Sequence, residues 1–163
     1  MKLYPSDSFE IETTMLLPEI VATLDACIEP KKIFRFFSKH KTFEGELTQD
    51  GFKVMRIISH RNSFLPVITG KFIAGQSGST ISIKMRLHAF TSAFLCVWFG
   101  GDILGIAIVL IGLASGRVMP TIHLIIPFGM FVFGFVMVVS CFWPEAKKAK
   151  GILTEILQKH NGK

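Results

Sequence analysis

The chain is poor in tyrosine, cysteine and acidic residues. It contains one tyrosine against 16 phenylalanines, three cysteines, and 12 acidic residues in 163. A single tyrosine leaves little of the aromatic surface that stacks on sugars, and no basic run with interleaved aromatics indicates binding of nucleic acid. Cys27, Cys96 and Cys141 are too few and too scattered to predict a disulfide framework or a zinc site. The five histidines also lack ligand spacing, so neither a metal nor another cofactor is expected.

Signals for export and for catalysis are also missing. The first 14 residues, MKLYPSDSFEIETT, contain no apolar segment, so no cleaved signal peptide is expected. The GQSG run at 75–78 lacks the lysine and the following helix of a phosphate loop. The polar run Ser59–Ser63 (SHRNS) has no nucleophile elbow, and neighbouring residues on a strand point to opposite faces. We therefore expect a protein that is not an enzyme.

Two long apolar runs dominate what is present. They cover Ala89–Ala114 and Pro120–Trp143 and are joined by Ser115–Met119. Each run exceeds the roughly 20 residues that a helix needs to cross the hydrocarbon core of a bilayer. The sequence therefore predicts a transmembrane helical hairpin over residues 89–143.

Basic residues flank this hairpin. Residues 1–88 carry 12 basic and 9 acidic side chains, residues 144–163 carry five and two, and the hairpin holds only Asp102 and Arg117. Positive charge beside membrane segments is typical of the cytoplasmic side, so both termini are expected there. Anionic lipid headgroups of the bilayer are the expected partner of this charge.

Residues 1–88 are predicted to form a cytoplasmic β-rich domain with one helix. The helix is expected over 18–28, where Pro18 and Glu19 suit a helix start. Asp50-Gly51 is a strong hairpin signal between two strands. Residues 31–37 fit either a strand or a helical turn. Alternation of apolar and polar residues marks four or five strands, at 8–14, 42–48, 52–57, 64–74 and 80–87.

The last of these strands runs into the hairpin without a linker. Lys84, Arg86 and His88 should therefore lie at the cytoplasmic membrane surface, where basic side chains are favoured. An ordinary solvated strand face next to a membrane segment explains the same residues.

The tail, residues 144–163, has apolar residues at helical spacing after Pro144-Glu145. It is expected to be a short amphipathic helix that lies on the bilayer or packs back on the β-rich domain. The fold class predicted from the sequence is an α+β membrane protein: a small β-rich domain, a transmembrane hairpin and this helix.

Asp102 is the one residue whose predicted position is costly. An aspartate at the centre of a membrane helix costs about 2.5–3.5 kcal/mol, so such residues usually face protein or water. In an antiparallel hairpin Asp102 should lie level with Phe133, where the sequence offers no cation. It could be protonated, bond across an oligomer, line a wet cavity or handle ions. Alternatively, Gly100-Gly101 breaks the helix and Asp102 caps the next segment, or the first segment is re-entrant.

Small residues recur along both predicted helices. Gly101 and Gly105 have GxxxG spacing, Gly112 follows one heptad later, and Gly129 and Gly134 offer a matching surface. Such spacing lets helices approach closely. These glycines either hold the hairpin together or form the interface of a homo-oligomer.

Arg61 and Asn62 are the candidate ligand-binding residues of the β-rich domain. The alternative interpretation is structural: Asn62 forms an Asx-type turn, and Arg61 contacts a carboxylate or a headgroup. An enzyme acting at the membrane surface would need a polar pocket around these two residues and Ser63.

A longer pattern covers residues 43–100. It consists of F-x-G at 43–45, GFKVMRIISHRNSFLPVITGKF at 51–72 and TISIKMRLH at 80–88, which leads into the hairpin. This pattern, RNSFLPVI-G above all, resembles an uncharacterised family of small bacterial membrane proteins. The resemblance implies the architecture and a place in the bacterial inner membrane, but no activity. We expect the β-rich domain to bind a protein, a lipid headgroup or a small ligand. The alternative is an oligomeric pore or transporter element that uses Asp102.

Overall fold

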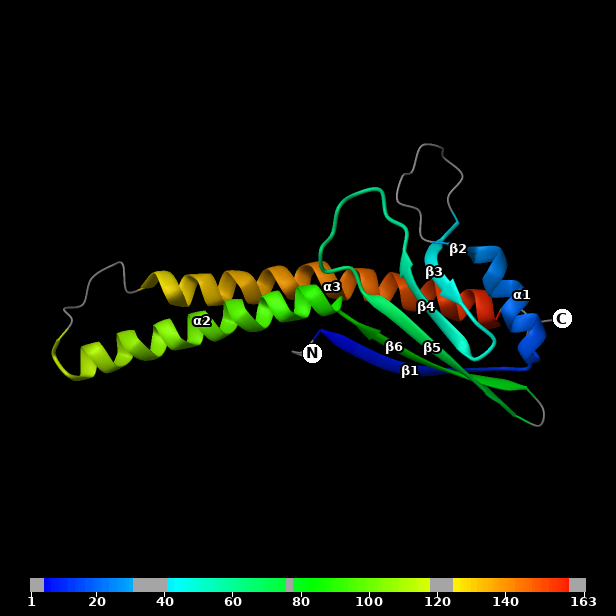
Figure 1. The fold of residues 1–163 in the computed structure, drawn as a ribbon, viewed down its shortest axis with the longest axis horizontal. Helices are drawn as coiled ribbons and strands as arrows, with labels where there is room; N and C mark the ends of the chain where they lie inside the picture. The colour runs from blue at the N-terminus through cyan, green and yellow to red at the C-terminus, as the bar shows by residue number, and fades with distance from the viewer. Residues whose placement is uncertain (1–4, 31–40, 76–77, 118–124, 159–163) are drawn as a thin grey trace.

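The computed structural model describes residues 5–30, 41–75, 78–117 and 125–158. Within these ranges the fold is α+β, with a six-stranded sheet and two long apolar helices (Figure 1). Residues 31–37, for which the sequence left strand and helix open, lie outside the described residues. The elements are β1 (Ser6–Thr13), α1 (Leu17–Cys27), β2 (Ile28–Glu29), β3 (Phe43–Leu47), β4 (Gly51–Arg56), β5 (Val67–Ala74), β6 (Ser79–Arg86), α2 (Ala89–Ala114) and α3 (Ile126–Gln158).

The strands follow the order β1-β6-β5-β4-β3-β2. All neighbouring strands are antiparallel except β2 and β3, which are parallel. The strands β3 to β6 form a meander, and β6, the last strand of the meander, also pairs with β1. The sheet has one strand more than expected, because the two-residue β2 follows α1 directly. The strand expected from residue 64 begins at Val67, after Pro66, which cannot donate to a ladder.

The alternation in the sequence sets the two faces of the sheet. In β6, Ile81, Ile83 and Met85 are fully buried, whereas Lys84 and Arg86 are exposed. Successive strand residues point to opposite faces, so one face of the sheet forms the core and the other carries the charges. The hairpin predicted from Asp50-Gly51 is present, and its turn lies at Gln49-Asp50, because Gly51 already belongs to β4 and accepts a hydrogen bond from the Thr48 N–H.

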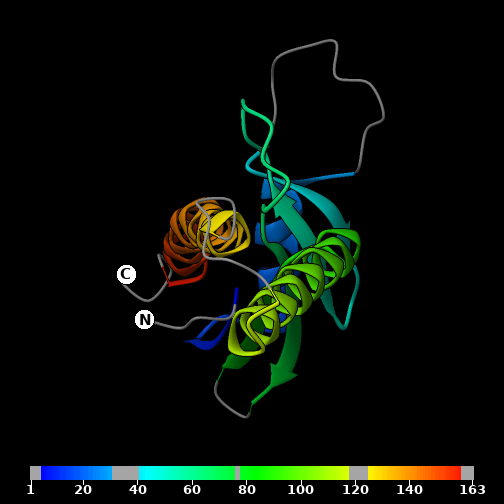
Figure 2. The same cartoon turned by 90° about the vertical axis from the view of Figure 1, so that its left-hand side faces the viewer.

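The helix α3 runs along most of the length of the molecule and joins its two parts (Figures 1 and 2). Its first half pairs with α2, and its second half packs on the buried face of the sheet. The predicted C-terminal helix is present, but it does not begin at Pro144, because it is continuous with the second apolar helix and Pro144 lies inside α3. Proline leaves the carbonyl four residues earlier without its usual donor, and a helix accommodates this when nearby groups adjust. In the turn of the helix before Pro144, the Ser140 hydroxyl donates to the Val136 carbonyl at 2.7 Å.

The second half of α3 supplies much of the core. The sequence allowed the tail to lie on the bilayer or to pack on the β-rich domain, and in the structure it packs on the sheet. The Thr13 hydroxyl donates to the Leu157 carbonyl at 2.9 Å, and the Lys150 ammonium lies 4.4 Å from the centre of the Phe9 ring. The predicted domain boundaries at residues 88 and 143 coincide with changes in amino-acid composition, but the hydrophobic core extends across both boundaries. The core residues from the second half of α3 are Phe142, Ala146, Ala149, Leu153 and Leu157.

The helix α2 is continuous over 26 residues. The alternative in which Gly100-Gly101 breaks this helix and Asp102 caps a new segment is therefore wrong, because the backbone stays helical through all three residues. Both α2 and α3 are long and apolar enough to cross a membrane. Most of the apolar side chains of α2 and of the first half of α3 face outward, unlike those of a helix in the core of a soluble protein.

Candidate binding site at the junction of the sheet and the helical hairpin

The outer face of the sheet, which we define as the face opposite α3, carries a row of polar residues. Strand register places Lys53 of β4 opposite Thr69 of β5, and Thr69 opposite Lys84 of β6. Arg86 lies two residues beyond Lys84 on the same face, at the end of β6 that leads into α2. The three cations therefore gather near the start of the hairpin, although they come from separate strands.

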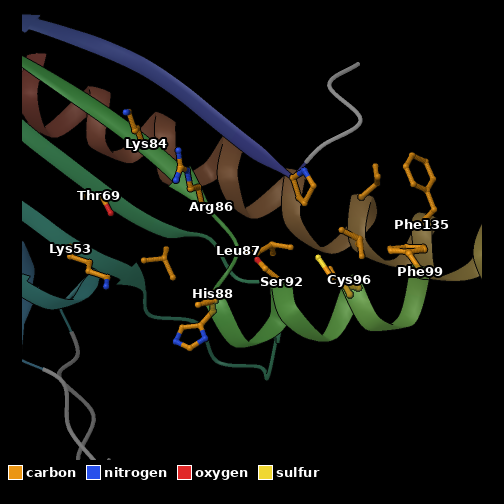
Figure 3. A pocket seen from close by; sticks show the side chains of 16 residues that line it. Lys53, Thr69, Lys84, Arg86, Leu87, His88, Ser92, Cys96, Phe99 and Phe135 are labelled. Atoms are coloured by element: carbon orange, nitrogen blue, oxygen red, sulfur yellow. The ribbon is translucent and has the colours of Figure 1, made fainter. Parts of the chain in front are cut away.

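A groove of about 770 Å³ begins at these cations and extends between the two long helices (Figure 3). Its size falls within the usual range for small-molecule sites. One end is polar, with Lys53, Thr69, Lys84 and Arg86. The other end is apolar and is lined by Leu95, Cys96 and Phe99 of α2 and by Phe135, Val138 and Val139 of α3.

The sequence predicted only part of this groove. Lys84, Arg86 and His88 stand out because they border the hairpin, and all three line the groove. Lys53 and Thr69 carry no local signal, since only the pairing of the strands brings them beside Lys84. Phe135 and Val138 were also missed, because their contribution depends on how α3 packs beside α2.

The cations of the groove are unpaired within the part of the chain that the structure describes. Lys53, Lys84 and Arg86 form no ion pair or side-chain hydrogen bond with any residue in the described ranges. Glu46 is opposite Lys53 in the strand register, so it moderates the charge at that edge. Glu10 of β1 is exposed on the same face and is a diagonal neighbour of Lys84, so the positive charge is least opposed at Arg86.

His88 lies where the sheet ends and α2 begins. Its side chain caps the helix, because Nδ1 accepts a hydrogen bond of 3.3 Å from the backbone N–H of Phe90. An imidazole that accepts at Nδ1 carries its proton on Nε2. His88 therefore offers a hydrogen-bond donor at the edge of the groove where α2 begins, and its ring points away from Lys84 and Arg86 (Figure 3).

The loop between β4 and β5 holds the base of the hairpin. The Asn62 side chain accepts from the Phe64 N–H at 2.9 Å, which is the expected Asx-type turn, and donates to the Cys141 carbonyl of α3 at 3.1 Å. The Thr91 hydroxyl of α2 donates to the Ser63 carbonyl at 3.0 Å. Asn62 is thus engaged in structural hydrogen bonds.

Arg61 is exposed and lines none of the described pockets. Asn62 and Ser63 border a second, mostly apolar hollow beside Phe90 and Phe94. The structure thus does not bring Arg61, Asn62 and Ser63 together in a polar pocket. No group of three or more possible metal ligands occurs among the residues that the structure describes.

An ion pair joins β4 to α3 on the buried side of the sheet. Arg56 binds Glu145 through Nε at 2.9 Å and through a second guanidinium nitrogen, and Lys148 lies 3.3 Å from the same carboxylate. The Glu145 side chain is only 6% exposed. Burial is the largest single influence on the pKa of Glu145, and it opposes ionisation of this carboxyl group. The hydrogen bonds and charges of Arg56 and Lys148 together outweigh it and hold the pKa of Glu145 below its ordinary value of 4.5.

Asp102 is buried within the hairpin. Phe99 lies against Phe131, and Gly105 lies against Pro127, so Asp102 lies level with the part of α3 between these two residues rather than with Phe133. One carboxylate oxygen has no hydrogen-bond partner, and neither does the buried indole N–H of Trp98. Asp102 is therefore a polar group enclosed by apolar neighbours.

The glycines of α2 have different surroundings. A Cβ on Gly105 would lie 4.0 Å from Pro127, whereas Gly101 is exposed with nothing within 4 Å. On α3, a Cβ on Gly134 would lie 3.2 Å from the Trp98 indole nitrogen, and Gly129 faces open space. Gly112 is partly buried. Close packing in the hairpin therefore depends on Gly134, and Gly101 is left on its outer surface.

No family model, curated protein or solved structure matches this chain. The function is therefore argued from the geometry of the junction.

Proposed function

We propose that this chain is an integral protein of the bacterial inner membrane that binds a ligand at the membrane surface and catalyses no reaction. In this proposal α2 and the first half of α3 cross the bilayer, and both termini are cytoplasmic. The sheet then lies against the headgroups and holds the groove at their level. The binding role rests on the groove, and the membrane position rests on the surface of the two helices.

The observation that carries the proposal is the apolar surface of the hairpin. Phe90 and Val97 are each 77% exposed, Ile111 is 67% exposed and Phe133 is 65% exposed. Soluble monomers rarely present apolar patches of this extent, and a bilayer would cover the whole length of both helices. The exposed cations begin where this surface ends, as expected for side chains at headgroup level.

Cysteine labelling in intact cells tests the orientation. In a variant whose three cysteines are replaced, a single cysteine at Ser115, between the helices, should react with a membrane-impermeant maleimide added outside. A matched cysteine at Lys147, which is also exposed, should react only after the cells are opened. Release of the protein from membranes by carbonate, or labelling of Lys147→Cys from outside, would refute the proposal.

A second candidate function rests on Asp102. A buried carboxylate without a partner in a membrane helix is a feature of proton and ion pathways. Exposed Gly101 would let a second copy approach this part of α2. The chain would then be an element of an oligomeric pore or transporter.

Ion flux into liposomes separates the two candidates. Reconstituted wild-type protein should conduct if the second holds, and Asp102→Asn should abolish the conductance because it removes the charge at constant shape. Wild-type vesicles without flux, or an unchanged flux in the variant, leave only the binding function.

A further inference from the structure

We propose that the groove binds one anionic phospholipid, with its phosphate at Lys84 and Arg86 and an acyl chain between α2 and α3. This inference rests on the proposed function, because it requires the hairpin to be in a bilayer. It names the class of ligand, for which the sequence left proteins, headgroups and small molecules open. Three features of the groove support it: charge, depth and access.

The charge of the groove fits an anion. Lys84 and Arg86 point to the same face from positions two apart on β6, and neither is paired with another described side chain (Figure 3). Arginine and lysine bind phosphate oxygens through charge-assisted hydrogen bonds. The hydroxyl of Ser92 lies next along the groove, and the Nε2 donor of His88 lies at its edge. Glu46 faces Lys53, so the phosphate is favoured on the β6 side.

The depth of the groove fits an acyl chain. Phe99 lies 11 residues after His88, or about 16 Å along the helix axis. This distance is about half of the roughly 30 Å thickness of the hydrocarbon core. The residues that line this part of the groove are mainly apolar and come from both helices. A free phosphate compound would leave them uncovered.

Access to the groove favours a lipid over a soluble partner. If α2 crosses the bilayer, Cys96 and Phe99 lie below the headgroups, where only membrane components diffuse. Both side chains line the groove, and Cys96 is exposed. A lipid can therefore enter sideways with its headgroup already at the level of Arg86, whereas an acidic peptide would reach only the polar end.

Native mass spectrometry of the full chain tests the proposal. Protein purified in mild detergent and freed of native lipid is mixed with equal amounts of phosphatidylglycerol and phosphatidylcholine that carry the same acyl chains. We expect one phosphatidylglycerol per chain, at least about tenfold preferred. Equal binding of both lipids by a correctly inserted protein would overturn the lipid assignment and leave the proposed membrane function intact. A protein that does not insert would overturn both.

Matched variants test each end of the groove. Lys84→Gln/Arg86→Gln should lower the preference about tenfold. The control Arg61→Gln/Lys71→Gln removes the same charge from exposed positions outside the groove and should behave as wild type. Equal retention of phosphatidylglycerol by the two double variants would overturn the placement of the phosphate.

The apolar end has its own pair of variants. Cys96→Trp should fill the groove and abolish binding of either lipid. Val97→Trp places the same side chain on an exposed neighbour that does not line the groove, and should bind normally. Normal binding by a folded Cys96→Trp protein would overturn the acyl-chain position. So would complete release of the lipid by an equal concentration of glycerol phosphate, which has the headgroup charge without the chain.

Discussion

The ion pair between Arg56 and Glu145 links stability to pH at the scale of single residues. The pKa of Glu145 is lowered in the folded protein, so its contribution to stability is present above its ordinary value of 4.5 and is lost as the pH falls through the folded-state value. Wild type should therefore lose more unfolding free energy than Glu145→Gln between about pH 6 and pH 3. Denaturant unfolding in detergent at both pH values measures the difference, and parallel losses in the two proteins would contradict it.

Removing the Glu145 carboxylate should also destabilise the fold at neutral pH. Glu145→Ala leaves Arg56 partly buried without its counter-charge, which should destabilise the fold by about 3 kcal/mol. Lys148 is 61% exposed, so Lys148→Ala is the matched control and should cost less than about 1 kcal/mol.

Asn62 is a structural residue whose loss should loosen the attachment of the hairpin. Asn62→Ala removes the hydrogen bonds to the Phe64 N–H and the Cys141 carbonyl, and should cost about 1–2 kcal/mol. Asn62→Asp keeps the first bond but sets a carboxylate against the carbonyl, so it should be at least as destabilising. Thermal unfolding in detergent and the rate of thiol labelling at Cys141 both report the change. Exposed Arg61→Ala should leave both unchanged, and a destabilised Arg61→Ala would argue against this account.

At the scale of elements, the contact between α2 and α3 depends on Gly134. A larger residue there would meet Trp98 and Phe99, so Gly134→Leu should force the helices apart and cost about 1–3 kcal/mol. Gly129→Leu is the matched control, because nothing lies within 4 Å of that position. The midpoints of thermal unfolding of the two variants should differ, and coincident midpoints would show that Gly134 does not set the approach of the helices.

Local patterns were enough to predict most elements. The alternation at residues 80–87, the turn signal at Asp50-Gly51 and the two apolar runs each depend on neighbours in sequence, and each has its counterpart in the structure. Pro144-Glu145 was misleading because the same pair suits a helix start. In the structure Glu145 pairs with Arg56, and the helix around it packs on the sheet, so tertiary contacts override the local signal.

At the scale of the whole molecule, the sheet and the second half of α3 form one folding unit. Leu153 is fully buried in the core beneath the strands. Leu153→Ala should therefore destabilise the fold by about 2–5 kcal/mol. The amides of β5 and β6 should exchange faster with deuterium, although both strands lie far from residue 153 in sequence. Lys147→Ala, at an exposed site on the same helix, should change nothing. Loss of protection confined to α3 would contradict a shared core.

The groove belongs to this same scale, which is why only its edge could be predicted. Lys84 and His88 are recognisable beside an apolar run, but the polar end as a whole needs three strands in register. Its apolar end needs two helices in contact. Asp102 is the reverse case: its unusual position within the apolar run is evident from the sequence, which left several surroundings open, whereas its burial and its neighbours follow only from the packing of α2 on α3.

The position of α3 in the sequence also constrains when the core of the protein can close during synthesis. The strands are complete at Arg86 and α1 already covers part of their apolar face, but the residues that the second half of α3 adds to this cover begin only at Phe142. A ribosome working at about 5–20 residues per second needs roughly 3–11 s to cover that distance. During this interval α2 and the first half of α3 leave the ribosome while the sheet still lacks the cover that the second half of α3 provides. Closure of the core thus comes last in synthesis, and a chain that stops before it leaves part of the sheet open to proteolysis.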